Sequence, residues 1–242
     1  MDSASPKEKE MSFLDHLEEL RSRIFKALIS VIIFGTITAI YVDEIVRNVL
    51  FYHLKQLNLK VQVLSPYGIV LLYMEVIIVS AFIFSMPAIL HQIWKFIAPA
   101  LLKKERVYIG WITFFTSFCF FSGIAFGYFV LIPTAMNFFA TFGTDLIALN
   151  ISADKYISFV LTLSLAAGIL FEMPMVAYFL SKIGILTPAF MRHYRRHAIV
   201  VILIVSAIVT PTPDIITQML LAMPMFLLYE LSIIISKYSQ SK

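Results

Sequence analysis

Charge is scarce in this 242-residue sequence. Charged residues make up 14% of the chain, against about 25% in soluble domains, whereas apolar residues make up 60%, against about 45–50%. With a mean hydropathy of +0.88, a chain of 27.6 kDa carries more apolar surface than a soluble globule of that size can bury. The composition therefore excludes a soluble enzyme, a disordered chain and a fibrous protein, and it predicts an integral membrane protein.

Residues that carry chemistry are also few. Cys119 is the single cysteine, which excludes a disulfide framework or a cysteine metal cluster. The motifs H-E-x-x-H and G-x-S-x-G and the P-loop are all missing. His193 and His197 have the spacing of metal ligands on one helix face, but the arginines in the same segment would repel a divalent cation. We therefore expect no catalytic residue, no metal and no cofactor, and we expect no cleavable signal peptide at the polar start of the chain.

Six charge-poor runs predict the membrane spans, since a helix needs roughly 20 mainly apolar residues to cross a bilayer. Residues 1–242 are expected to form a single all-α membrane domain, with helices over about 23–42, 67–90, 107–130, 154–181, 197–211 and 214–236. The fifth run is short, at about 22 Å by helix rise. Either the bilayer is locally thinner there or the true helix ends lie elsewhere.

Basic residues predict the orientation of these helices. Fifteen of the 19 Lys and Arg residues fall in the segments 1–26, 91–106, 182–197 and 237–242, which alternate with the predicted spans. Cytoplasmic loops carry such an excess. We therefore place both termini in the cytoplasm, with residues 1–22 as an N-terminal cytoplasmic segment, and we assign the net charge of +4 to this asymmetry rather than to nucleic-acid binding.

Three Met-Pro pairs lie inside predicted helices, at Pro87, Pro174 and Pro224. A proline inside a helix frees a carbonyl and bends the axis, so three bends would curve the bundle around a concave wall. Prolines are frequent in transmembrane helices in any case, so both interpretations stay open.

Acidic residues inside the membrane are candidates for function, because a carboxylate there costs about 2.5–3.5 kcal/mol on insertion scales. Glu172 lies ten residues before Lys182, about 15 Å from the inner surface by helix rise. It is either functional or a satisfied hydrogen-bond partner inside the bundle. Glu75, in the outer half of the second helix, is either functional or a buried polar anchor. Glu230 is expected to extend to the inner surface.

A second set of acids lies outside the predicted spans. Asp15, Glu18 and Glu19 cluster near the start, and Glu105 is the one acid among eight basic residues in 91–106 and 182–197. These carboxylates either receive a cationic peptide or pair locally with bases such as Arg23 and Lys103.

Four ordered motifs carry a resemblance to a known family: H-L-E-E-L-R at His16–Arg21, Q-I-W-K-F-I-A-P-A-L at Gln92–Leu101, F-E-M-P at Phe171–Pro174, and T-P-x-P-D…Q at Thr210–Gln218. Over roughly residues 11–238 the chain resembles the TatC family of the twin-arginine protein translocase. The resemblance implies a glove-like bundle of six helices in the plasma (inner) membrane of a bacterium. It also implies a receptor that binds twin-arginine signal peptides of folded precursor proteins and supports export driven by the proton-motive force.

The same resemblance implies partners and site residues. The implied partners are the single-span Tat subunits A and B, membrane lipid and further copies of the chain, in homo- and hetero-oligomers. Residues implied in signal-peptide binding are Glu19, Leu20, Arg21, Phe96 and Glu105. The implied intramembrane polar site holds Glu172, with Glu75 added from its position, and partner-subunit docking is implied for Thr210, Asp214 and Gln218. The rival interpretations are a secondary transporter with midplane carboxylates and an intramembrane enzyme, which the missing motifs disfavour.

Overall fold

The computed structural model describes residues 13–56, 61–100, 107–141, 151–210 and 215–240. The helices are α1 (Phe13–Ile40), α2 (Val42–Glu44), α3 (Tyr52–Gln56), α4 (Gly68–Ile97), α6 (Ile109–Phe126), α7 (Ile132–Thr141), α8 (Ala153–Leu170), α9 (Met173–Lys182), α10 (Pro188–His193), α11 (Arg195–Val209) and α12 (Ile215–Gln240). Two π-helical segments, η1 (Ile45–Leu50) and η3 (Gly127–Leu131), and a 3₁₀ turn, η2 (Ala98–Ala100), interrupt them. Short strands β1 (Val61–Gln62) and β2 (Ile151–Ser152) pair in parallel.

Five helices in the described part of the chain are long and apolar enough to cross a membrane: Leu14–Ile40, Gly68–Ile97, Ile109–Thr141, Ala153–Lys182 and Ile215–Ser239. The helix expected as the fifth of six spans is α11, and its 15 residues measure about 22 Å. That length is below the roughly 30 Å of a hydrocarbon core. The structure therefore supports five spans by length and composition, and the sixth remains a proposal.

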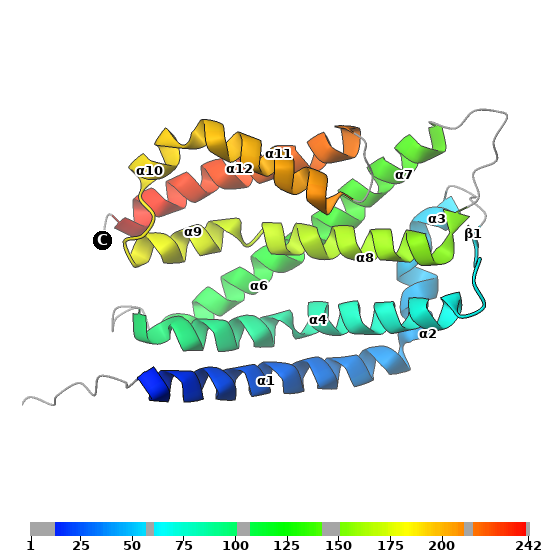
Figure 1. Ribbon diagram of the computed structural model, residues 1–242, viewed down its shortest axis with the longest axis horizontal. Helices are drawn as coiled ribbons and strands as arrows, with labels where there is room; N and C mark the ends of the chain where they lie inside the picture. Colours follow the sequence, from blue (N-terminus) through cyan, green and yellow to red (C-terminus); the bar gives the residue numbers. More distant parts are fainter. Residues whose placement is uncertain (1–12, 57–60, 101–106, 142–150, 211–214, 241–242) are drawn as a thin grey trace, which may run out of the picture.

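The first helix is longer than expected, because it begins at Phe13 instead of near residue 23. Two ion pairs along the helix, Arg21–Glu18 and Arg23–Glu19, have the spacings that stabilise helical turns. The polar motif H-L-E-E-L-R is therefore the first part of α1. Helix α1 packs mainly on α4 and leaves a long apolar face exposed, as expected of a helix bordered by lipid (Figure 1).

The long helices alternate in direction, so that α1 begins and α12 ends at the same end of the bundle (Figure 1). The ends of α4 and α9 also lie there, together with α10. We call this the basic end. Its described basic side chains are Arg21, Arg23, Lys26, Lys95, Lys182, Arg192, Arg195, Arg196 and Lys237. The opposite end is formed by α2, η1, α3 and the paired strands (Figure 1).

The prolines do not act alike. Pro174 lies in the first turn of α9, directly after a break that separates α8 from α9 at Phe171 and Glu172. Pro87 and Pro224 lie inside α4 and α12, each of which is assigned as one continuous helix. The break before Pro174 shows how one span divides into two helices.

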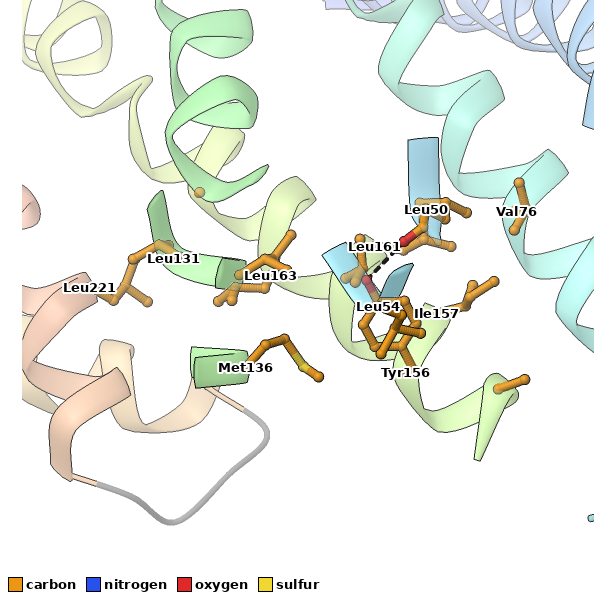
Figure 2. Close-up of a cluster of buried hydrophobic side chains, with 14 of the residues drawn as sticks. Leu50, Leu54, Val76, Leu131, Met136, Tyr156, Ile157, Leu161, Leu163 and Leu221 are labelled. Atoms are coloured by element: carbon orange, nitrogen blue, oxygen red, sulfur yellow. Dashed lines mark hydrogen bonds between the residues drawn. The ribbon is translucent and has the colours of Figure 1, made fainter. Parts of the chain in front are cut away.

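The main hydrophobic core lies between η1, α4, η3, α8 and α12. Leu131 of η3 meets Leu163 of α8 and Leu221 of α12, and all three side chains are almost fully buried (Figure 2). In the same cluster Tyr156 donates its hydroxyl to the backbone oxygen of Leu50 at 2.8 Å, the dashed line in Figure 2. The core thus joins the opposite end to the middle of the bundle.

Helices α6 and α8 approach unusually closely at glycine. A Cβ atom on Gly123 would lie 2.5 Å from the backbone oxygen of Ala167 and 2.8 Å from Cα of Gly168. Gly127, four residues on, faces Ser164 at a Cβ–Cα distance of 3.0 Å. Lipid is as apolar as the helix surfaces, so the hydrophobic effect does not hold membrane helices together and close van der Waals packing must do so. Small residues four apart allow that packing, because they let two backbones approach closely. The spacing G-x-x-x-G at 123–127 is readable in the sequence, although we did not predict this helix contact from it.

Candidate functional site

The acidic residues of α1 lie against the last turns of α4 at the basic end. Arg23 donates from Nε and Nη2 to Oε1 of Glu19, at 3.3 and 2.9 Å, and from Nη1 to Oε1 of Gln92 at 3.4 Å. Gln92 belongs to α4, so these three side chains join two helices. The acidic cluster was expected either to receive a cationic peptide or to pair with neighbouring bases. In this structure Glu19 pairs with a neighbouring base, Arg23. Lys103, the other expected local partner, lies outside the described residues.

An aromatic contact joins the same two helices one turn further along. The ring of His16 stacks on Phe96, with ring centroids 4.4 Å apart and planes 16° from parallel. Trp94 fixes this end of α4 to α6, because its Nε1 donates to Oγ1 of Thr116 at 3.0 Å in a buried contact. The expected residues Glu19 and Phe96 therefore both lie where α1 packs on the last turns of α4.

The remaining expected residues of the peptide site differ in environment. Leu20 is half-buried, whereas Arg21 is exposed and forms an ion pair with Glu18 at 3.3 Å. Glu105 lies outside the described residues. In sequence it follows Phe96 by nine residues.

Glu172 occupies the break between α8 and α9. Its side chain is buried, and its Oε1 atom has no hydrogen-bond partner among the residues described. Cys119 of α6 lies within electrostatic range of this carboxyl. The alternative to a functional role is that Glu172 is a hydrogen-bonded side chain inside the bundle. That would require a donor to its Oε1 atom, and the described part of the chain provides none.

Glu75 and Glu172 do not share a site. Glu75 is half-buried on α4, 22 residues before Ile97 and thus about 33 Å from the end of that helix. Glu172 lies ten residues before the end of α9, or about 15 Å. Both helices end together at the basic end (Figure 1), so the carboxylates differ in depth by about 18 Å. A transporter site built from this pair is therefore not present in the described structure.

Helices α11 and α12 are joined by the polar residues expected to dock partner subunits. Gln218 donates from Nε2 to the backbone oxygen of Leu203 at 2.9 Å, which bonds α12 to α11. Thr210 is buried and donates its hydroxyl to the backbone oxygen of Ser206 at 2.8 Å. Asp214 lies outside the described residues. An apolar cavity of about 330 Å³ lies between the same helices, lined by Leu203, Met219 and Phe226 among others.

Two residues of α12, Tyr229 and Glu230, make further contacts with α10 and α11 at the basic end. Arg195 donates from Nη2 to Oε2 of Glu230 at 2.7 Å, and Tyr229 donates its hydroxyl to the backbone oxygen of Met191 at 2.8 Å. Glu230 therefore pairs with Arg195 of α11, and both side chains remain partly exposed at the basic end. His193 and His197 are exposed, and no group of three potential metal ligands is found within the described ranges.

Taken together, long apolar helices in the described part of the chain, with most basic side chains gathered at one end, define a polytopic helical membrane protein. A model of the family described as Sec-independent protein translocase protein (TatC) matches residues 15–224. The chain belongs to the TatC family, whose members are transport components and not enzymes.

Individual relatives agree with this assignment. The TatC protein of Helicobacter pylori strain J99 is 41% identical over 224 residues, which cover 92% of this chain and 87% of that protein. The TatC protein of Aquifex aeolicus is 37% identical, with 96% of this chain and 97% of the relative covered. The similarity to TatC read from the four motifs is confirmed, and the chain is a bacterial membrane protein.

Solved structures of TatC have the same fold. Two crystal structures described as the twin-arginine translocase receptor TatC match with TM-scores of 0.78 and 0.81, at 36% and 35% identity. The matches cover 93% and 90% of this chain, and 99% and 98% of the other chains.

Proposed function

We propose that this chain is the receptor component of a twin-arginine translocase and that it binds the signal peptides of folded precursor proteins at the basic end. In this proposal the basic end faces the cytoplasm and holds both termini, and the protein resides in the plasma (inner) membrane of a bacterium. The bundle has six spans, with α11 as the short fifth span, and it forms a concave, glove-like wall. Export is driven by the proton-motive force and requires the single-span Tat subunits A and B.

The observations that support this proposal most directly are the contacts between α1 and the end of α4. Arg23 donates to Glu19 on its own helix and to Gln92 on α4, and His16 stacks on Phe96. An arginine binds a carboxylate through planar, paired hydrogen bonds that a lysine ammonium cannot reproduce. A receptor for two adjacent arginines therefore needs two acids close together. Glu19 is one of them, and Glu105, which follows α4 in the sequence, is proposed as the second. Leu20, Arg21 and Phe96 complete the binding surface.

The other expected residues are assigned to later steps. Thr210, Asp214 and Gln218 form the docking surface for the single-span subunits on α11 and α12. Glu172 is the intramembrane polar group that faces the passing signal peptide, and Glu75 is a second polar position nearer the opposite end. Membrane lipid and further copies of the chain surround this unit.

The test uses full-length protein in lipid nanodiscs and a synthetic twin-arginine signal peptide. A hydrogen bond to a charged group contributes about 1.5–3 kcal/mol, so Glu19→Gln and Glu105→Gln should each weaken binding roughly 10- to 100-fold. Replacing the paired arginines of the peptide by lysines should weaken binding similarly. Glu44→Gln makes the same chemical change on an exposed acid at the opposite end and should leave the affinity unchanged. Unchanged affinity in Glu105→Gln and Glu19→Gln, at low and high salt, would contradict the proposal.

A further inference from the structure

One oxygen of the Glu19 carboxylate, Oε1, already accepts hydrogen bonds from Arg23 in this structure. Two nitrogens of Arg23 converge on this atom, at 2.9 and 3.3 Å. The side chains of Arg23 and Glu19 are only 23% and 19% exposed, whereas the neighbouring pair Arg21–Glu18 is 70% and 73% exposed. Partly buried pairs are screened less by water and salt than exposed ones. The Arg23–Glu19 pair is therefore the more persistent of the two.

The group that occupies Glu19 is a guanidinium, the same group that a signal arginine would bring. A paired contact of a guanidinium with both carboxylate oxygens needs Oε1, so an entering arginine must displace Arg23 from Oε1 to form it. Arg23 is attached to the same helix four residues away, so it competes at a high effective concentration, as any tethered group does.

We propose that Arg23 is a built-in competitor that holds the Glu19 carboxylate occupied until a signal peptide displaces it. This inference rests on the proposed function, since it concerns the regulation of the same site. Gln92 provides Arg23 with a second position. Its Oε1 atom already accepts from Nη1 at 3.4 Å, so a displaced guanidinium keeps a hydrogen-bond partner on α4. Displacement then exchanges one arginine for another and leaves neither charge without a partner.

Competition of this kind has a quantitative signature. Arg23 must leave Glu19 whichever peptide binds. Its removal therefore raises the affinity for every peptide by the same factor, and the ratio of the affinities for twin-arginine and twin-lysine peptides stays unchanged. Measured ion pairs of modest exposure correspond to about a two- to fivefold effect on an equilibrium. Arg23→Gln should therefore tighten the binding of a twin-arginine peptide about two- to fivefold. A residue that only positions Glu19 would give the reverse, namely weaker binding.

The control must distinguish two effects of removing Arg23 on peptide affinity. One is the loss of its hydrogen bonds to Glu19, and the other is the loss of one positive charge near the site. Lys26 is exposed and lies three residues beyond Arg23 on α1, so Lys26→Gln removes one positive charge nearby without touching the pair. A double-mutant cycle supplies the second control. In a Glu19→Gln background there is no carboxylate left to occupy, so Arg23→Gln should change the affinity there by no more than Lys26→Gln does.

The experiment measures peptide affinity in nanodiscs for the wild-type chain, Arg23→Gln, Lys26→Gln, Glu19→Gln and the double variant. Arg23→Lys keeps the charge and the helix but loses the paired contact, so it should tighten binding partially and carries the test if Arg23→Gln does not fold. Weaker or unchanged binding in both Arg23 variants overturns the proposal. Equal tightening with and without Glu19 also overturns it, because the effect is then long-range charge. If Glu19→Gln alone has no effect, the proposed function fails at Glu19 instead, and the two failures are distinguishable.

Discussion

His53 is a buried histidine at the opposite end of the bundle. It is 6% exposed, its ring lies 4.7 Å from that of Tyr128 and 5.4 Å from that of Tyr52, and its Nε2 atom has no hydrogen-bond partner among the described residues. Burial lowers the pKa of His53, because the charged imidazolium is poorly solvated there, although a backbone contact with Tyr128 opposes this. We therefore expect His53 to make the opposite end sensitive to acid.

The sign of that sensitivity follows from the lowered pKa. As the pH falls below the ordinary histidine value of about 6.5, the unfolded chain takes up a proton before the folded protein does, so the folded state loses stability. We expect the thermal unfolding midpoint in nanodiscs to be lower at pH 5.5 than at pH 7.5. His53→Phe keeps an aromatic ring without a titrating group and should reduce that difference. His193→Gln, at an exposed histidine, should retain it. An equal fall in wild type and His53→Phe would refute this assignment.

At the scale of single residues, the sequence indicated which side chains were unusual but not which partners they have. Glu172 and the acids near residue 19 stand out, because charge is rare and costly in a membrane chain. The contacts of Arg23 with Gln92 and of His16 with Phe96 join residues 69 and 80 positions apart. No local pattern specifies such pairs, since they depend on how α1 and α4 are rotated against one another.

At the scale of helices, the contact between α6 and α8 leaves no room for a side chain at Gly123. A Cβ atom on Gly123 would lie 2.5 and 2.8 Å from two backbone atoms of α8, on Ala167 and Gly168, which cannot move aside as the end of a flexible side chain can. Extra atoms in a packed interior commonly destabilise by about 1–3 kcal/mol, and a backbone clash lies at the upper end of that range.

Gly123→Ala should therefore lower the unfolding midpoint and reduce the yield of folded protein in detergent. Gly110→Ala is the matched control on the same helix, because a Cβ atom there meets nothing within 4 Å. That change should leave stability unchanged or raise it by about 0.5–1 kcal/mol, since alanine is the better helix former. Comparable midpoints for the two variants would show that the close approach of α6 and α8 does not limit stability.

Helix boundaries were predicted well where the helix ends with its apolar run, as α9 does at Lys182, and poorly where the helix continues beyond that run. Helix α4 extends through the polar residues after Leu90 to Ile97, and α1 begins ten residues before the expected start. In both cases polar residues continue a helix outside the apolar run, supported by contacts such as Arg23–Glu19 and Trp94–Thr116. Hydropathy marks the part of a helix that lies in hydrocarbon and not the full helix.

At the scale of the whole molecule, the arrangement of ends predicts the topology. Because the basic residues gather where α1 begins and α12 ends, that end is expected in the cytoplasm. Single cysteines at Ser22 and Ala189, which are exposed at the basic end, should be shielded from impermeant thiol reagents in intact cells. Cysteines at Asn48 and Gln62, exposed at the opposite end, should react in spheroplasts. Cys119 is replaced by alanine beforehand, and labelling of Ser22→Cys in unbroken cells would reject the proposed orientation.

The sequence by itself determined the class of molecule, its helical content and its family. These follow from local properties: the apolar composition, the length of charge-free runs and four short motifs in order. It also marked Glu19, Phe96, Glu172 and Gln218 as candidate site residues, by resemblance to the family. The fifth apolar run, short in the sequence, is also short in the structure, where α11 has 15 residues.

Only the tertiary structure decided how those residues meet. It placed Arg23 on the Glu19 carboxylate, bonded Gln218 to the backbone of α11, and separated Glu75 from Glu172 in depth. The physical reason is that a membrane helix is apolar on nearly every face, so hydropathy does not show which face meets a neighbour. Rotation and register are set instead by close contacts such as Gly123 against Ala167 and by a few polar bonds between helices.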